Sequence, residues 1–146
     1  MELVGYLGRH LKDDAVIELL EAHDLDVVYH FDRLHENTAD FYRVSAKSVG
    51  FALRFNGQQL LDTVWCYILG RDGFAPVDTT LIGVPCHMSC FDAKNVANTS
   101  GETISEPPAG SPMEGKWILL KGANHWAHYE FNDRRLALVT LTLPRA

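Results

Sequence analysis

Residues 49–69 read VGFALRFNGQQLLDTVWCYIL, and this stretch decides the fold class. Large apolar residues occupy every second position at its start, namely Val49, Phe51, Leu53 and Phe55. That two-residue period is typical of a half-buried strand. Asn56-Gly57 then interrupts the alternation, and this dipeptide tolerates the positive φ values of a tight turn. Residues 60–69 are rich in strand formers and end before Asp72-Gly73, so we predict a β-hairpin over 49–69.

A second hairpin is predicted near the C-terminus. Residues 126–131 form one strand, Asn132-Asp133 the turn, and residues 136–143 a returning strand that Pro144 ends. A helix is predicted over 13–25 because apolar residues follow helical spacing behind a capping Asp13 or Asp14. A shorter helix is expected around 91–98, and a short strand at 27–31 precedes a polar turn at 35–37.

The two hairpins resemble each other. Phe55-Asn56 and Phe131-Asn132 lie 76 residues apart, as do Leu60 and Leu136. Two further matches, Leu3-Val4-Gly5 with Leu81-Ile82-Gly83 and Asp14-Ala15 with Asp92-Ala93, lie 78 residues apart. We therefore predict one domain, 1–146, with internal repeats 1–73 and 79–143, each a helix followed by strands. The alternative is that hairpins resemble one another by chance. Either way the class is α+β, a largely antiparallel sheet with two or so helices on one face.

Residues 99–115 contain three prolines and three glycines, which remove hydrogen-bond donors and favour irregular backbone. We predict a long exposed loop there. Loops of this length are often functional, although a tolerated surface insertion is an alternative. Among the residues of this loop we expect Glu102 and Glu106 to contact a partner.

Composition excludes several classes of function. The formal net charge is −6, and no cluster of Lys and Arg suits a phosphate backbone, so no nucleic-acid partner is expected. The apolar runs are too short to cross a membrane, and the N-terminal residues do not form a signal peptide. Three cysteines without framework spacing suit reduced thiols in the cytoplasm. An acidic surface would accelerate approach to a basic partner, or would merely maintain solubility.

Recognisable catalytic motifs are missing, so we expect neither an enzyme nor a cofactor. Cys86, His87 and Cys90 form the only dense group of soft ligands, but a zinc site would need a fourth, and we expect no metal there. On the predicted strand 126–131, Trp126, His128 and Glu130 share one face. That face is either a partner-binding patch or a solvated strand surface.

The central stretch resembles immunity proteins that bacteria encode beside secreted polymorphic or type VI secretion toxins. The pattern comprises Gly50-Phe51-x-Leu53-x-Phe55, Leu61-x-Thr63-Val64-Trp65-x-Tyr67-Ile68, Val84-Pro85, Met88-Ser89, Phe91-Asp92, Trp117 and His128-x-x-Phe131. These loose hydrophobic patterns cover residues 48–143. The sequence around 78–86 and the length of the proline-rich loop depart from the usual pattern. A more distant likeness is to tandem helix-plus-sheet inhibitors such as β-lactamase inhibitory protein, whose two repeats form a concave sheet.

The resemblance implies a cytoplasmic immunity protein that binds its cognate toxin and blocks the active site or the substrate path. If the toxin is a nuclease, its groove should be basic and would suit an acidic inhibitor. Two other hypotheses remain open. One is a metal protein or small enzyme that uses Cys86, His87 and Cys90. The other is a structural or small-ligand-binding module with a cavity lined by Trp65, Tyr67 and Tyr129.

Overall fold

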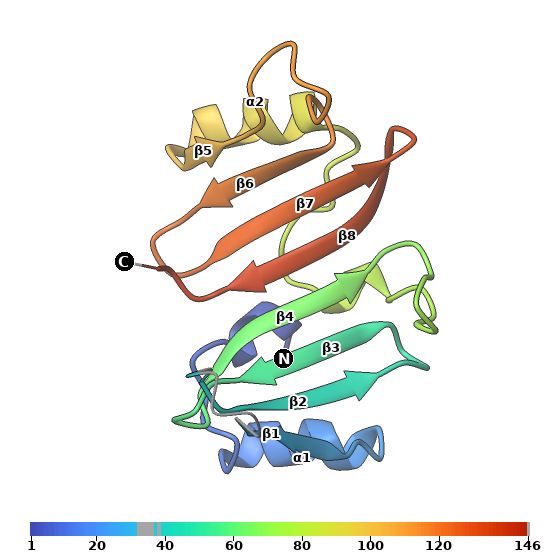
Figure 1. The fold of residues 1–146 in the computed structure, drawn as a ribbon, viewed down its shortest axis with the longest axis vertical. Coiled ribbons are helices and arrows are strands. Elements are labelled where there is room, and N and C mark those ends of the chain that lie inside the picture. Colours follow the sequence, from blue (N-terminus) through green and yellow to red (C-terminus); the bar gives the residue numbers. More distant parts are fainter. Residues whose placement is uncertain (32–36, 38, 146) are drawn as a thin grey trace.

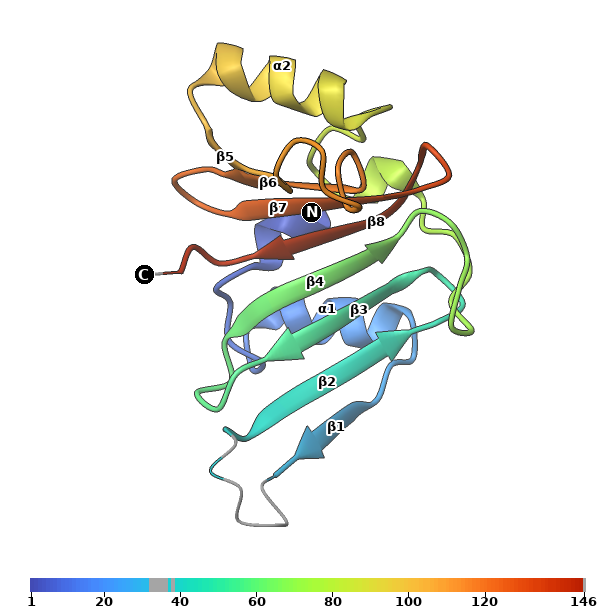
Figure 2. The ribbon, with the colours of Figure 1, turned by 45° about the horizontal axis from the view of Figure 1, so that its top comes forward.

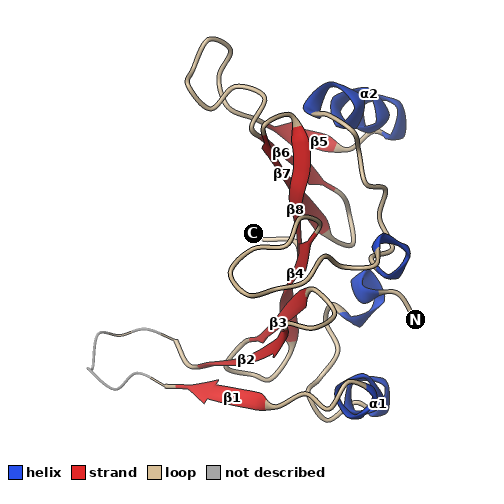
Figure 3. Ribbon diagram, turned by 90° about the vertical axis from the view of Figure 1, so that its right-hand side faces the viewer, coloured by secondary structure: helices blue, strands red, loops and turns tan. Residues whose placement is uncertain are grey.

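The fold is an α+β arrangement in which one antiparallel sheet of eight strands is covered by helices on one side (Figures 1 and 3). The computed structural model describes residues 1–31, 37 and 39–145. The strands are β1 (Val27–His30), β2 (Phe41–Ala46), β3 (Phe51–Phe55), β4 (Leu61–Tyr67), β5 (Thr103–Ser105), β6 (Trp117–Lys121), β7 (Trp126–Asn132) and β8 (Arg135–Thr142). The helices are α1 (Asp14–Ala22), α2 (Cys90–Ser100) and the 3-10 helices η1 (Leu3–Tyr6) and η2 (Thr79–Leu81). The predicted α+β class is confirmed. A polar turn was also predicted at 35–37, and residues 35 and 36 of that turn lie outside the described residues.

The sheet has the strand order β1-β2-β3-β4-β8-β7-β6-β5, so β4 and β8 join its two halves (Figure 2). The element order is the same in both halves: a 3-10 helix, an α-helix and four strands. Each half also has a register shift at corresponding places, between Arg54 and Phe55 and between Glu130 and Phe131. A repeat at the level of the sequence remains a prediction.

Both predicted hairpins are present, but their turns use different residues from those expected. In the β3–β4 turn the positive φ falls at Gln59 (65°), whereas Asn56 acts through its side chain. The Asn56 Oδ1 accepts hydrogen bonds from the backbone nitrogens of Gln58 (2.9 Å) and Leu60 (3.1 Å). Two consecutive residues with positive φ, which we expected at Asn56-Gly57, are found after β4, at Asp72 (54°) and Gly73 (82°). Asparagine therefore shapes the turn as an acceptor.

The β7–β8 turn has two non-glycine residues in the left-handed region, Asp133 (φ 49°) and Arg134 (φ 65°). A side chain at such a φ costs roughly 1–2 kcal/mol, which glycine avoids. We expect Arg134→Gly to raise the free energy of unfolding by about 1 kcal/mol in urea denaturation. Gln58→Gly provides a contrast, because Gln58 does not have a positive φ, so glycine there relieves no strain and should lower the free energy of unfolding instead. An unchanged or lower midpoint for Arg134→Gly would contradict this account.

The prediction that residues 99–115 form only a loop is wrong at its first third. Residues 99 and 100 complete α2, and Gly101 ends the helix with a left-handed φ of 79°. Residues 103–105 then pair with β6 as β5, where Ile104 lies opposite Leu120. The prolines and most glycines fall after this strand, so a short Thr-Ile-Ser segment remained free to extend the sheet. The irregular loop is 106–116.

Helix α2 forms although its sequence pattern is weak. Ser89 caps it, because its Oγ accepts a hydrogen bond from the backbone nitrogen of Asp92 (3.1 Å). Ala93 and Ala97 are both completely buried against the sheet. Tertiary packing therefore compensates for the poor helix formers at Asn95 and Asn98.

The hydrophobic core lies between the sheet and the helices. Its largest fully buried side chains include Tyr129, Phe51, Phe55, Leu53, Leu61 and Ile82. The two 3-10 helices meet beneath the junction of the halves, where the Val4 nitrogen donates to the Ile82 carbonyl (3.0 Å). Within the described residues, no helix is long and apolar enough to cross a membrane. A second, smaller cluster lies on the other side of the sheet, where Phe74 packs with Ala52, Tyr67 and Leu138. The rest of that side carries no helix and is available for contacts (Figure 3).

Candidate protein-interaction surface

The side of the sheet opposite α1 and α2 forms a surface that we call the open face (Figure 3). Strand register places alternate residues of six strands on it. They are Phe41, Arg43 and Ser45 of β2, Ala52 and Arg54 of β3, Thr63, Trp65 and Tyr67 of β4, Leu138, Thr140 and Thr142 of β8, Trp126, His128 and Glu130 of β7, and Trp117, Leu119 and Lys121 of β6.

All three tryptophans of the chain lie on the open face. Trp65, Trp117 and Trp126 are each partly exposed, in contrast to the fully buried aromatic residues on the helix side. Tryptophan and arginine are enriched in binding hot spots because they combine a large apolar area with a polar group. Three tryptophans on one helix-free face therefore indicate a contact surface.

The aromatic rings of this face are held by neighbouring cations and by an imidazole. The pairs are Arg43 over Trp65 (4.7 Å to the ring centroid), Arg54 over Phe41 (4.9 Å), Lys121 over Trp126 (4.9 Å) and His128 stacked on Trp117 (5.4 Å between centroids). Each such contact stabilises one arrangement of two long side chains by roughly 0.5–1 kcal/mol at an exposed site. Side chains ordered in this way lose less entropy when a partner binds.

A shallow hollow of about 250 Å³ lies on the open face over β6, β7 and β8. It is lined by Leu119, Trp126, His128, Thr140, Thr142 and Arg145. Its apolar walls and polar rim would accept a single large side chain from a partner protein. We call it the Trp126 hollow.

Two loops, 68–78 and 106–116, project from the sheet on the side of the open face (Figure 3). Phe74 in the first loop stacks on Tyr67 with 4.1 Å between ring centroids and is 7% exposed. From the same loop, Arg71 Nη1 lies 2.6 Å from Glu130 Oε2. The carboxylate of Glu130 is therefore already neutralised within the chain, although we had expected it to be available to a partner.

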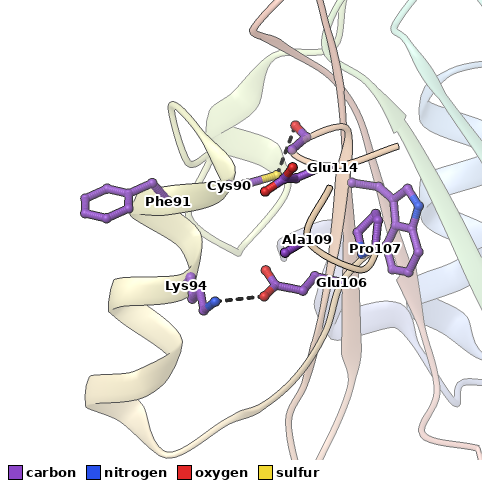
Figure 4. A pocket seen from close by; sticks show the side chains of 9 residues that line it. Cys90, Phe91, Lys94, Glu106, Pro107, Ala109 and Glu114 are labelled. Atoms are coloured by element: carbon purple, nitrogen blue, oxygen red, sulfur yellow. Dashed lines mark hydrogen bonds and ion pairs between the residues drawn. The ribbon is translucent and has the colours of Figure 1, made fainter. Parts of the chain in front are cut away.

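The second loop encloses a smaller hollow of about 230 Å³ at the sheet edge (Figure 4). Trp117, Cys90 and Glu106 are among the residues that line it. Lys94 Nζ of α2 is 2.7 Å from Glu106 Oε1, as the dashed line in Figure 4 marks. This ion pair connects the loop to α2 and helps to position it next to Trp117.

The structure separates the five side chains expected to contact a partner into two groups. Trp126, His128 and Glu130 lie together on the open face, at alternate positions of β7. Glu106 pairs with α2, and Glu102 Oε1 accepts a hydrogen bond from Ser100 Oγ at the end of that helix (3.0 Å). Glu102 and Glu106 are therefore occupied at α2 and do not extend the open face. The reason is that β5 turns these residues toward the helix.

Several residues of the open face were missed in the sequence analysis, above all Arg43, Arg54 and Lys121. Their alternation with buried Val44, Leu53 and Leu120 was a usable signal for each strand taken alone. That signal could not show that the three strands carry these cations onto one surface with Trp126.

The cavity predicted between Trp65, Tyr67 and Tyr129 does not exist, because these side chains lie on opposite faces. Tyr129 pairs with Val139 on the helix side, is 1% exposed, and its hydroxyl donates to the Pro85 carbonyl (3.0 Å). Trp65 and Tyr67 lie on the open face. The strand period is two, so residues from separate strands share a face only when register aligns them.

The cysteine thiols are in environments that favour their neutral form. Burial raises the pKa of Cys66 to about 12 and also raises the pKa of Cys86 and Cys90 above their ordinary value. A reactive cysteine requires the opposite shift, because the thiolate is the nucleophile and the metal ligand. In the part of the chain that the structure describes, no group of three or more His, Cys, Asp and Glu side chains is arranged to hold a metal ion.

His87 gives the fold a dependence on pH. The side chain is 8% exposed, and its ring contacts Tyr129 edge-on at 5.0 Å. Burial lowers the pKa of this imidazole below 6.5, although Asp92 and Glu102 act in the opposite direction. Below about pH 6.5 the unfolded chain therefore binds more protons than the folded chain. The free energy of unfolding is accordingly highest above that pH and decreases as the pH falls through the lowered pKa.

We expect the urea midpoint of the wild type to decrease between about pH 7 and about pH 5, and His87→Phe to show a smaller decrease. Phenylalanine keeps a ring beside Tyr129 but cannot be protonated. Burial also lowers the pKa of His128, so part of the decrease remains in the variant. An identical pH profile for wild type and variant would exclude this role of His87.

Comparison of the chain with protein-family models, with curated proteins and with solved structures finds no match.

Proposed function

We propose that this protein binds another protein through the open face and acts as an immunity protein that neutralises a cognate secreted toxin. The observation that carries the proposal is the collection of all three tryptophans, partly exposed, on the helix-free side of the sheet. Burial of such residues in a partner supplies most of the binding energy in many interfaces.

The shape of the open face favours a protein partner over a small ligand. Its Trp126 hollow, of about 250 Å³, is below the usual range of small-molecule sites, which is roughly 300–1,000 Å³. A second hollow of about 430 Å³ at the β1 end falls within that range, but most of its lining residues are polar or charged, whereas small-molecule sites are mostly apolar. A broad sheet surface flanked by the loops 68–78 and 106–116 suits a protein surface better. The neutral thiols likewise give no support to a cysteine-based enzyme or metal protein.

The mechanism that we propose is occlusion in the cytoplasm: the open face covers the active site or the substrate path of the toxin. The likeness to immunity proteins and to sheet inhibitors with two halves supports this mechanism. The net charge of −6 would speed approach to a basic toxin such as a nuclease. Part of the acidic charge lies on the helix side, where α1 and its cap contribute Asp13, Asp14, Glu18 and Glu21. That charge would act on the approach over long range, whereas the open face itself carries more cations than carboxylates and would contact a less basic part of the toxin.

The test is co-expression with the product of the adjacent reading frame in a heterologous bacterial host. We expect that product to arrest growth when expressed alone and the wild-type protein to restore growth. A Trp65→Ala/Trp126→Ala variant should lose protection, whereas Phe91→Ala, which removes an aromatic side chain 71% exposed on α2, should retain it.

Full protection by the double tryptophan variant, expressed at the level of the wild type, would refute binding through the open face. A neighbouring product that is harmless alone would refute the immunity function itself.

A further inference from the structure

Arg43 and Arg54 form a cationic pair on the open face. They are direct cross-strand partners in the pairing of β2 with β3. Opposite residues of an antiparallel pair have Cβ atoms roughly 4.5–5.5 Å apart, and like charges in this arrangement are destabilising. The two guanidinium groups lie over Trp65 and Phe41. The two arginines thus start from facing backbone positions, and each guanidinium group is held over an aromatic ring of a neighbouring row of the open face.

The described part of the chain supplies no counter-ion for this pair. With the residues that the structure describes, neither arginine forms an ion pair, and Arg54 Nε is buried without a hydrogen-bond partner among them. Asp62 lies next to Thr63, the residue opposite Arg54, but accepts its hydrogen bond from Thr63 Oγ1 (2.9 Å). A charged group without an acceptor is costly for a folded chain. Arg54 Nε itself is shielded, but the residue is only partly buried, so an acceptor from outside can approach its accessible atoms.

Arg43 also borders a hollow of about 430 Å³ at the β1 end of the open face. Asp24 and Asp26 line the same hollow without reaching ion-pair distance of Arg43. Their charge repels an anion from that end. An anion is therefore best placed on the other side of Arg43, between it and Arg54.

The open face suits an anion from a polypeptide better than an anion from a nucleic acid. Bases of single-stranded nucleic acid require exposed aromatic rings for stacking, whereas the Trp65 and Phe41 rings are already covered by the two arginines. The net charge of −6 also opposes a polyanion. Among the paired strand positions of the open face, Arg43, Arg54 and Lys121 outnumber the one carboxylate, Glu130.

We propose that Arg43 and Arg54 together bind a carboxylate from an acidic segment of the partner protein, an inference that rests on the proposed protein-binding function. Three strand spacings, about 14 Å, separate Arg54 on β3 from the Trp126 hollow around β7. An extended chain covers that distance in about four residues. The segment therefore has an Asp or Glu side chain about four residues from a large apolar side chain that fills the hollow.

The experiment uses a random dodecapeptide library displayed on phage and selected against the immobilised full-length protein. We expect the selected sequences to share an Asp or Glu and a large apolar residue about four positions apart. One such peptide is then synthesised with a fluorescent label, together with its Glu→Gln or Asp→Asn analogue, and binding is measured by anisotropy.

We expect Arg43→Gln/Arg54→Gln to weaken binding by about 10- to 100-fold, the value of charged hydrogen bonds. The amide analogue should bind the wild type with a similar loss and the variant with no further loss. Lys12→Gln/Arg134→Gln removes the same charge at exposed positions away from the open face and should leave binding within about twofold. The thermal unfolding temperature of the double arginine variant at low salt should change little, because the loss of two cation–π contacts is offset by removal of the repulsion between the two charges.

Several results would overturn the proposal. If the peptides lose affinity for Trp126→Ala but keep it for the double arginine variant, the carboxylate site is wrong while the open face remains the binding surface. If neither variant affects binding, or if no peptide is selected, the carboxylate site is rejected, whereas the growth-protection experiment decides the immunity function separately. Tighter binding of labelled oligo-dT or oligo-U, lost in the arginine variant, would assign the pair to nucleic acid.

Discussion

Replacing Gly50 with alanine is expected to lower the free energy of unfolding by about 2–5 kcal/mol. Gly50 has a φ of 83°, and an added Cβ would lie 2.5 Å from the backbone nitrogen of Val77 and against the carbonyl oxygen of Ala75. Backbone hydrogen bonds prevent either segment from moving away: the Tyr67 nitrogen donates to the Gly50 carbonyl, and the Val77 nitrogen donates to the Tyr67 carbonyl. Urea denaturation measures the effect.

Gly115→Ala is the matched control, because Gly115 has a similar φ of 74° but no atom within 4 Å of an added Cβ. Gly115→Ala should lower the free energy of unfolding only by the cost of the left-handed conformation, about 1–2 kcal/mol. The excess loss at Gly50 then reports its close packing against residues 75–77. Equal losses at both positions would show that this packing adjusts freely, contrary to the expectation.

The second large effect concerns binding. Trp65→Ala and Trp126→Ala are each expected to weaken affinity for the cognate toxin by about 30- to 1000-fold, the range of hot-spot truncations. Trp65 lies under Arg43 and Trp126 contributes to the Trp126 hollow, so each variant removes both an apolar contact and the support of a cation. Calorimetry or surface plasmon resonance with the purified toxin measures the change.

Phe91→Ala again serves as the comparison and should bind within about threefold of the wild type, as peripheral exposed positions do. Circular dichroism should show all three variants folded, because the tryptophans are only partly buried. A loss of affinity confined to Phe91→Ala would move the interface to the helix side and reject the open face.

Local patterns in the sequence were sufficient for much of the fold. The strand at 51–55, the strand formers at 61–67 and the cap at Asp13 each depend on neighbours within a few residues, and all three are present. The strand at 51–55 is not half-buried as predicted, because Ala52 on its other side is buried in the cluster around Phe74. The boundary at 49 was wrong by two residues, because Gly50 takes a left-handed φ that belongs to a turn. Strands β2, β5 and β6 were not predicted. The three residues of β5 have no period of their own and form a strand only beside β6.

The candidate site divides in the same way. Trp126, His128 and Glu130 share a face by the period of one strand, and the structure places them on one face. Glu130 also contacts Arg71, which is 59 residues away along the chain, and no sequence pattern around either residue predicts this contact. Glu102 and Glu106 were grouped with the site by their charge, whereas their positions depend on where α2 packs.

By itself the sequence determined an α+β chain, its two hairpins and the alternation of residues along the strands of those hairpins, because these features follow from side-chain direction and turn chemistry over short distances. Only the tertiary structure decided that β4 pairs with β8, with Trp65 opposite Thr140, and that Arg43 lies opposite Arg54. Those pairings set the composition of the open face. They depend on register between strands far apart in sequence, which the burial of the whole core selects and no local pattern specifies.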